Sequence, residues 1–183
     1  MSTQPISMAP STSPQPCSLM LNTGTLKVTT PSDREVKMVR VFDAPRAMVF
    51  DAFTRCELLK RRFGPRGFSL AVCEGDFKVG GTWRFVLRGP DGAEMGMRGV
   101  IREMVRPERL VHAESFDDYP GESLVTTQFI EEAGKTTVTI TVRYESKQIR
   151  DAVIASGMEH GAAETYDRLA EYLESRGHIT TGA

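Results

Sequence analysis

The stretch KVGGTWRFVLRGPDGAEMGMRGV, residues 78–100, decides the fold. It contains two segments of alternating apolar residues, joined by Gly-Pro-Asp-Gly, a sequence typical of a tight turn. Trp83, Phe85 and Leu87 lie at alternate positions, so they share one face of an extended strand. The stretch therefore predicts two strands joined by a turn, with an apolar face that another element must cover.

Further strands are predicted on both sides of this stretch, because short β-branched and aromatic segments alternate with turn-rich ones. Residues 35–42 predict a first strand, and six more are expected at residues 68–74, 82–88, 94–105, 109–116, 123–131 and 135–145. Such short connections favour an antiparallel meander.

Helices are predicted in three places. One begins near Asp43 or Ala44 as its cap, with Pro45 in its first turn, and a second over residues 55–63 ends at Gly64-Pro65. The C-terminal helix, Lys147 to Ser175, carries its apolar residues at helical spacing: Ile154, Met158, Ala162, Tyr166, Leu169 and Leu173. The order β-α-α-β×6-α predicts an α+β fold, a curved antiparallel sheet of about seven strands around this helix.

Composition predicts one folded domain. Its 183 residues have a formal net charge of −1, so no overall field attracts nucleic acid or an anionic membrane. We expect a disordered leader over residues 1–32, a single domain over residues 33–176 and a flexible tail over residues 177–183. The first residues lack the basic and apolar regions of a secretory signal.

The three cysteines fit neither a disulfide framework nor a zinc site, since they are odd in number and widely spaced. Cys56 and Cys73 are predicted to act as small hydrophobic residues. This usage favours a reducing, cytoplasmic setting.

Small residues in the first half of the C-terminal helix predict a cavity between helix and sheet. Gly157 and Gly161 are four apart, so they share one face, and Ala162 follows. Large residues fill the second half. The alternative is a solid core, in which Trp83 and Phe85 pack directly onto the helical glycines.

Polar residues in this region suggest possible chemistry. His112 and Glu114 are alternate residues of one predicted strand, so both could act as acid and base in a cavity. The alternative is that both face water. Tyr166 could place its hydroxyl in the cavity while its ring packs. We find no motif for a cofactor or a metal.

Several segments together resemble a known superfamily: FDAPRAMVFDAFT, LLKRRFGPRGF, CEGDFKVGGTWRFVLRGPDG, GVIREMVRPERLVHAESF and SGMEHGAAETYDRLAEYL. Over about residues 35–175 the chain resembles the START-like, helix-grip SRPBCC superfamily, in the branch named for homologues of the activator of the heat-shock protein 90 ATPase. The resemblance implies a helix-grip fold whose cavity binds a small, often hydrophobic molecule. Characterised superfamily members include lipid carriers, hormone receptors, polyketide cyclases and aromatases.

The chain departs from the pattern at one point, because Arg62 and Phe63 stand where close relatives usually have paired tryptophans. Arg62 could meet an anionic group of the guest near the cavity mouth. The interpretation that we favour is that it extends to solvent while its stem packs.

The predicted function is the binding of a small hydrophobic or amphipathic molecule by a monomer or homodimer. Two alternatives remain: a cyclase or isomerase that uses His112 and Glu114, and a chaperone ATPase co-regulator, which the lack of the namesakes' separate N-terminal domain disfavours. The expected binding residues face the cavity from sheet and helices: Phe63, Trp83, Phe85, Met97, His112, Phe116, Met158, Ala162 and Tyr166.

Overall fold

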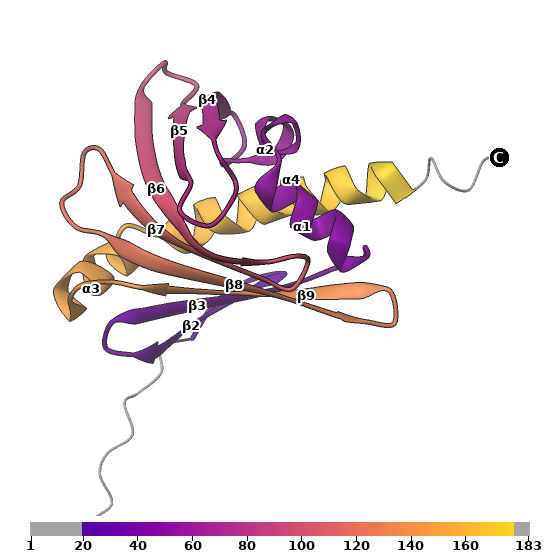
Figure 1. The fold of residues 1–183 in the computed structure, drawn as a ribbon. Helices are drawn as coiled ribbons and strands as arrows, with labels where there is room; N and C mark the ends of the chain where they lie inside the picture. The colour runs from indigo at the N-terminus through magenta and orange to yellow at the C-terminus, as the bar shows by residue number, and fades with distance from the viewer. Residues whose placement is uncertain (1–19, 178–183) are drawn as a thin grey trace, which may run out of the picture.

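A nine-stranded antiparallel sheet dominates the computed structural model, which describes residues 20–177 (Figure 1). The strands lie in the order β1-β2-β3-β9-β8-β7-β6-β5-β4. Their bounds are β1 Met20–Thr23, β2 Leu26–Ser32, β3 Glu35–Phe42, β4 Ser69–Gly75, β5 Thr82–Arg88, β6 Glu94–Val105, β7 Arg109–Phe116, β8 Ser123–Glu132 and β9 Lys135–Arg143. The predicted meander of six strands, β4 to β9, is confirmed.

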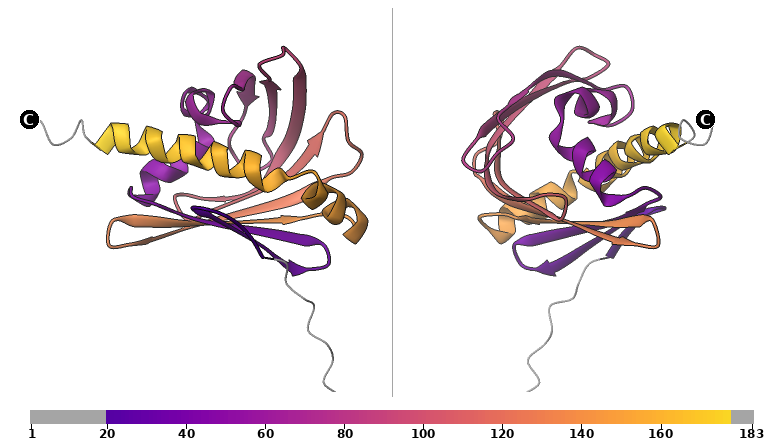
Figure 2. Two further views of the ribbon diagram at one scale, coloured as in Figure 1. Left: turned by 180° about the vertical axis from the view of Figure 1, so that it is seen from behind. Right: turned by 45° about the vertical axis from the view of Figure 1, so that its right-hand side comes forward.

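The helices lie on the concave side of this sheet. They are α1 Arg46–Thr54, α2 Cys56–Arg62, α3 Lys147–Ala155 and α4 Met158–Gly177. The sheet curves around α4, while α1 and α2 lie beside α4 at one end (Figure 2). This arrangement confirms the predicted α+β fold with a long C-terminal helix. None of these helices is both long and apolar enough to cross a bilayer.

The apolar face of the sheet forms the core, as the alternation predicts. Val138, Ile140 and Val142 of β9 are at most 7% exposed, and Trp83, Phe85 and Leu87 of β5 are equally buried. Leu169 and Leu173 of α4 complete the core from the helix side. Large side chains in the second half of α4 thus fill the space above the sheet.

Two strands lie where the sequence predicted a disordered leader. Residues 20–32 form β1 and β2, and β2 pairs with β3 at the edge of the sheet. Leu26 and Val28 are essentially inaccessible, because they continue the inner apolar face. The prediction was made from the composition of residues 1–32 as a whole, and the polar residues before position 20 concealed the short alternating segment. Residues 1–19 and 178–183, the remainder of the predicted leader and nearly all of the tail, lie outside the described residues.

The predicted C-terminal helix is two helices, α3 and α4, with a break at Gly157. Gly157 has a φ of 72°, a left-handed conformation that glycine adopts without steric cost and that no residue adopts inside an α-helix. Ser146 caps α3 by accepting a hydrogen bond from the Ile149 amide. Gly157 is therefore a helix-terminating residue, and its predicted place on a helical face beside Gly161 is wrong. The first helix also begins later than expected, with Pro45 as its N-cap.

A disulfide bond joins α2 to the edge of the sheet, contrary to the prediction for the cysteines. Cys56, the first residue of α2, is bonded to Cys73 of β4, and their Cα atoms are 5.7 Å apart. Their sequence separation of 17 hid the pairing, since only the fold brings α2 against β4. The bond removes the cysteine-based argument for a reducing compartment.

We expect loss of this disulfide to destabilise the domain. A cross-link that closes a loop of this length limits the unfolded chain and contributes about 3 kcal/mol. The Cys56→Ser/Cys73→Ser variant should lose about that much free energy of unfolding in a denaturant titration. A reductant should lower the stability of the wild type and leave that of the double variant unchanged. Equal stability of both proteins without reductant would contradict the structural role of the bond.

Candidate functional site

Three rows of side chains cross the inner face of the sheet in the half formed by β5 to β9. Strand register defines the rows, because paired residues project to the same side. The first is Phe85–Met97–Phe116, the second Trp83–Gly99–Glu114–Ser123, and the third Ile101–His112–Val125–Val142. Five predicted binding residues, Trp83, Phe85, Met97, His112 and Phe116, are thus brought together on one surface.

Gly99 determines how the tryptophan lies. A Cβ at this position would come within 2.5 Å of the Trp83 ring and would also clash with the Ala113 carbonyl of β7. The indole therefore lies over the empty position on β6 and reaches the His112 ring, edge to face, with centroids 5.4 Å apart. Trp83 packs against the sheet, and the alternative of an indole seated on helical glycines does not hold.

His112 and Glu114 form the polar part of this surface. His112 Nε2 lies 3.5 Å from Glu114 Oε2, and the two side chains are only 16% and 20% exposed. His112 Nδ1 is buried and has no hydrogen-bond partner among residues 20–177. A buried polar atom without a partner is costly, so this nitrogen lowers the stability of the folded protein.

Two tyrosines face the same interior from other elements. Burial raises the pKa of Tyr166 on α4 to about 12, with nearby Arg62 opposing the shift. Burial likewise raises the pKa of Tyr144, which follows β9, and the Glu114 carboxylate adds to the effect on both phenols. Both hydroxyls are therefore protonated and neutral at physiological pH and can donate hydrogen bonds.

The remaining predicted residues approach from the helices. Phe63, at the end of α2, packs edge to face on Phe85 with centroids 5.5 Å apart. Met158, Ala162 and Tyr166 of α4 contact the same core, yet all three keep part of their surface accessible. Gly161 faces Pro65, which an added Cβ would meet at an ordinary contact distance of 3.4 Å, so this glycine does not border the inner face of the sheet. Only Ala162 remains of the small residues that suggested an unfilled space.

Arg62 contradicts the prediction that its head group extends to solvent. Its side chain is 1% exposed, and Nε and Nη2 donate hydrogen bonds of 3.2 and 2.8 Å to the Ala52 carbonyl. The guanidinium also faces the Phe53 ring at 4.5 Å. Burial lowers the pKa of Arg62 to about 10, so it stays cationic at neutral pH at a cost on the order of 3 kcal/mol.

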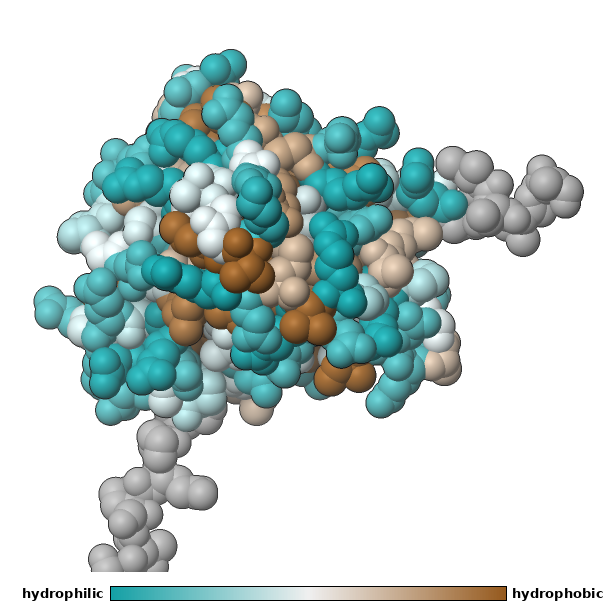
Figure 3. All heavy atoms as spheres, in the orientation of Figure 1, coloured by the Kyte–Doolittle hydropathy of each residue, from teal (hydrophilic) through white to brown (hydrophobic). Residues whose placement is uncertain are grey.

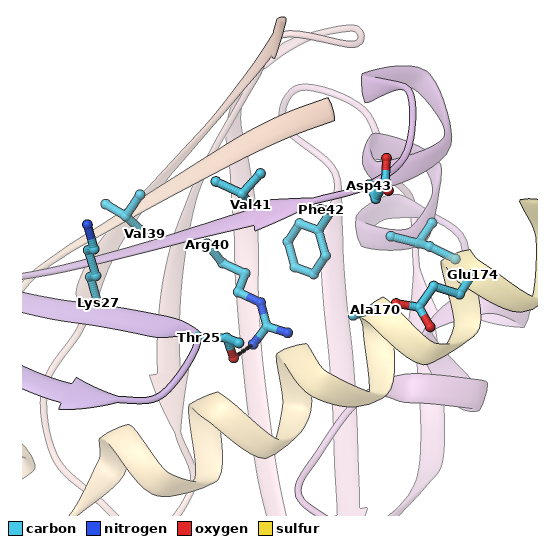
Figure 4. A pocket seen from close by; sticks show the side chains of 10 residues that line it. Thr25, Lys27, Val39, Arg40, Val41, Phe42, Asp43, Ala170 and Glu174 are labelled. Atoms are coloured by element: carbon cyan, nitrogen blue, oxygen red, sulfur yellow. Dashed lines mark hydrogen bonds between the residues drawn. The ribbon is translucent and has the colours of Figure 1, made fainter. Parts of the chain in front are cut away.

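A groove of about 360 Å³ lies elsewhere, between α4 and strands β2 and β3 (Figure 4). None of the predicted binding residues lines it. Its buried cation is already paired, because Arg40 contacts Asp167 at 2.7 Å and also donates to Thr25 (Figure 4). Its other lining residues are Lys27, Val39, Val41, Phe42, Asp43, Ala170, Leu173 and Glu174.

The face drawn in Figure 3 is mostly hydrophilic at its margins, and apolar side chains gather near its centre. Across residues 20–177, no cluster of three or more histidine, cysteine, aspartate or glutamate residues could hold a metal ion. The inner face of the sheet is therefore the candidate site.

Three interior residues were not predicted as part of the site: Arg62, Tyr144 and Phe53. Tyr144 continues the alternation of β9, so the pattern could have revealed it. Phe53 stacks on Tyr166, with centroids 6.3 Å apart, through a helix-to-helix contact that sequence spacing does not encode. Arg62 gave a misleading signal, because arginine is rarely buried without an ion pair.

Comparison with known proteins gives the same fold. Residues 43–174 match the model of the family described as Activator of Hsp90 ATPase homolog 1-like protein. A protein of known structure from Rhodobacter sphaeroides is 31% identical, with a TM-score of 0.79 over 82% of this chain and 99% of its own. A protein from Chromobacterium violaceum is 25% identical, with a TM-score of 0.70 over 78% of this chain and 99% of its own. A protein from Nitrosomonas europaea is 21% identical, with a TM-score of 0.73 over 80% of this chain and 98% of its own. No curated protein matches the chain.

The packing of the Trp83 ring over Gly99 can be tested by substitution of the glycine. In Gly99→Ala the new methyl group meets the Ala113 carbonyl and the indole, so we expect a loss of about 1–3 kcal/mol in stability and a red-shifted Trp83 emission. Gly161→Ala is the matched control, because its methyl group meets only Pro65 and alanine is favoured in a helix by about 1 kcal/mol. Thermal unfolding and fluorescence spectra measure both. Unchanged emission and stability in Gly99→Ala would contradict this packing.

Proposed function

The chain belongs to the family of Activator of Hsp90 ATPase homolog 1-like proteins, and from that premise we propose that it binds a small apolar or amphipathic molecule between the inner face of the sheet and α4. The binding surface would consist of the three rows on β5 to β9, with Phe63, Met158, Ala162 and Tyr166 opposite them. Trp83 and Phe85 supply flat apolar area, and Met97 can adapt to an irregular guest.

The observation that carries this proposal concerns the two tyrosines. Tyr166 lies deep enough for burial to raise the pKa of its phenol to about 12, yet its side chain keeps accessible surface. Tyr144 combines burial and accessibility in the same way. In a solid core such side chains would be sealed by their neighbours. Accessible surface on deeply placed residues supports unfilled volume beside them.

Half-buried apolar side chains around the tyrosines point to the same volume. Phe116, Met158 and Ala162 all pack on the core cluster, but none is fully buried. An apolar guest that covered them would gain roughly 25 cal/mol for each Å² removed from water. The groove beside Arg40 is a weaker candidate, because its buried cation is already paired with Asp167.

Binding can be followed with the protein's own fluorophore, since Trp83 is the sole tryptophan. Titration with decanol should change the intensity and wavelength of Trp83 emission in a saturable way. Ala162→Phe should abolish the change by filling the volume, whereas Ala152→Phe, on the exposed side of α3, should preserve it. A flat titration of the wild type with decanol and with aromatic alcohols would contradict the proposal.

A second candidate is an acid–base enzyme of cyclase or isomerase type, which the contact between His112 and Glu114 favours. The pair lies on the proposed surface beside Trp83, where a guest would meet the free His112 Nδ1. In this reaction, Glu114 would accept a proton from a carbon next to a carbonyl and pass it to His112 Nε2, while the proton on His112 Nδ1 moves to the resulting enolate. The chaperone co-regulator alternative draws only on the family description.

Deuterium exchange tests the enzyme hypothesis directly. NMR of a bound cyclic ketone in D₂O should show exchange at the carbon next to the carbonyl, which Glu114→Gln should slow by 10²-fold or more. His112→Gln should slow it as well, while the Trp83 titration with the ketone stays unchanged in both variants. If the ketone exchanges no faster with the wild-type protein than in D₂O alone, this chemistry is excluded for the ketone.

A further inference from the structure

Arg62 is a cation that the protein buries without balancing its charge. It is the last residue of α2, and its side chain is 1% exposed. Across residues 20–177 no carboxylate lies within ion-pair distance of its guanidinium, although 13 pairs of a lysine or arginine with a carboxylate occur elsewhere in that range. Buried charges in proteins are ordinarily paired. The missing counter-charge is the feature that needs an explanation.

The hydrogen bonds of Arg62 satisfy only part of the guanidinium. Nε and Nη2 both donate to one acceptor, the Ala52 carbonyl near the end of α1. The rings of Phe53 and Phe63 lie 4.5 and 5.9 Å from its central carbon. A guanidinium has five N–H donors, and the Nη1 group finds no acceptor among residues 20–177. Arg168 shows the contrast, because its Nη1 donates to the Gly64 and Pro65 carbonyls.

Arg62 lies among side chains that border the proposed binding volume. Burial lowers the pKa of Arg62, and Tyr166 of α4 opposes this shift while the Arg168 cation adds to it. Tyr166 in turn stacks on Phe53, the ring beneath the guanidinium. Phe63, next to Arg62, reaches Phe85 on the sheet. The Arg62 guanidinium, the Tyr166 phenol and the aromatic rings of Phe53 and Phe63 therefore lie close together. In the proposed complex, one end of the guest on the inner face of the sheet would reach this cluster.

We propose that Arg62 binds the carboxylate of the guest, so that the ligand is an amphipathic monocarboxylic acid whose apolar body lies on the inner face of the sheet. The inference rests on the proposed function and specifies its ligand. A planar carboxylate matches the fork of a guanidinium, and one negative charge balances one buried positive charge. A dianionic head group fits less well, because the Glu114 carboxylate acts on the same Tyr166 phenol and would repel added negative charge. The Tyr166 hydroxyl can donate a further hydrogen bond.

Paired probes of equal chain length test the inference. Isothermal titration of the wild type should show decanoate binding at least about tenfold more tightly than decanol, since a hydrogen bond to a charged partner is worth that much. Arg62→Met should lose this preference and still bind decanol. Arg61→Met is the matched control, with the same charge change at an exposed position of the same helix, and should keep the preference.

A second measurement needs no variant. The carboxyl carbon of ¹³C-labelled decanoate reports its ionisation by NMR, and the bound acid should have a lower pKa than the free acid, because a nearby cation favours the carboxylate. A raised pKa, as an apolar cavity alone would produce, would overturn the inference. Equal binding of decanoate and decanol by the wild type would overturn it too and leave the proposed function standing. Binding of neither probe would overturn both.

Discussion

The curved sheet has one apolar face, and its burial is the constraint on which the rest of the structure depends. A sheet of this size must be covered on that face, and α4 is the long helix that covers it, with α1 and α2 closing one end. Leu169 and Leu173 seal the region above the central strands. Toward β7, the facing part of α4 offers Met158 and Ala162, and His112, Glu114 and Phe116 of that strand remain only partly buried.

Two polar groups of this interior are buried without a full set of partners among residues 20–177. His112 interrupts an otherwise apolar row formed with Ile101 and Val125, and its Nδ1 has no partner within the described part of the chain. Arg62 retains its charge although burial disfavours it. Each residue lowers stability when the protein is considered alone, because unsatisfied buried polar groups cost free energy. Such costs concentrate at functional sites, where a ligand supplies the missing partner.

The sequence predicted the core of the fold well, and the reasons are local. Alternation in residues 82–88 and 135–145 marked strands whose inner faces are buried as expected, and the apolar stripe of residues 154–173 identified the covering helices. It missed β1 and β2, because a polar leader dominated the composition around Leu26 and Val28. Gly157 was misplaced since a glycine within a helical pattern does not reveal its φ angle.

The site was predicted less completely, because its geometry depends on contacts between distant elements. Strand parity placed Trp83, Phe85, His112 and Phe116 on one face, and the register of β5, β6 and β7 brings them together. The pairing of Cys56 with Cys73 and the burial of Arg62 arise from the packing of α2, which no spacing rule encodes. The seat of the indole over Gly99 likewise requires knowledge of the neighbouring strand.

The most direct measurement of unfilled volume under α4 is a crystal structure of the protein under xenon pressure, because xenon occupies apolar cavities without needing polar contacts. The account predicts a xenon atom between Ala162 on α4 and Met97 and Phe116 on the sheet. Crystals that contain no xenon beneath α4, or that bind it only in the groove beside Arg40, would contradict the account.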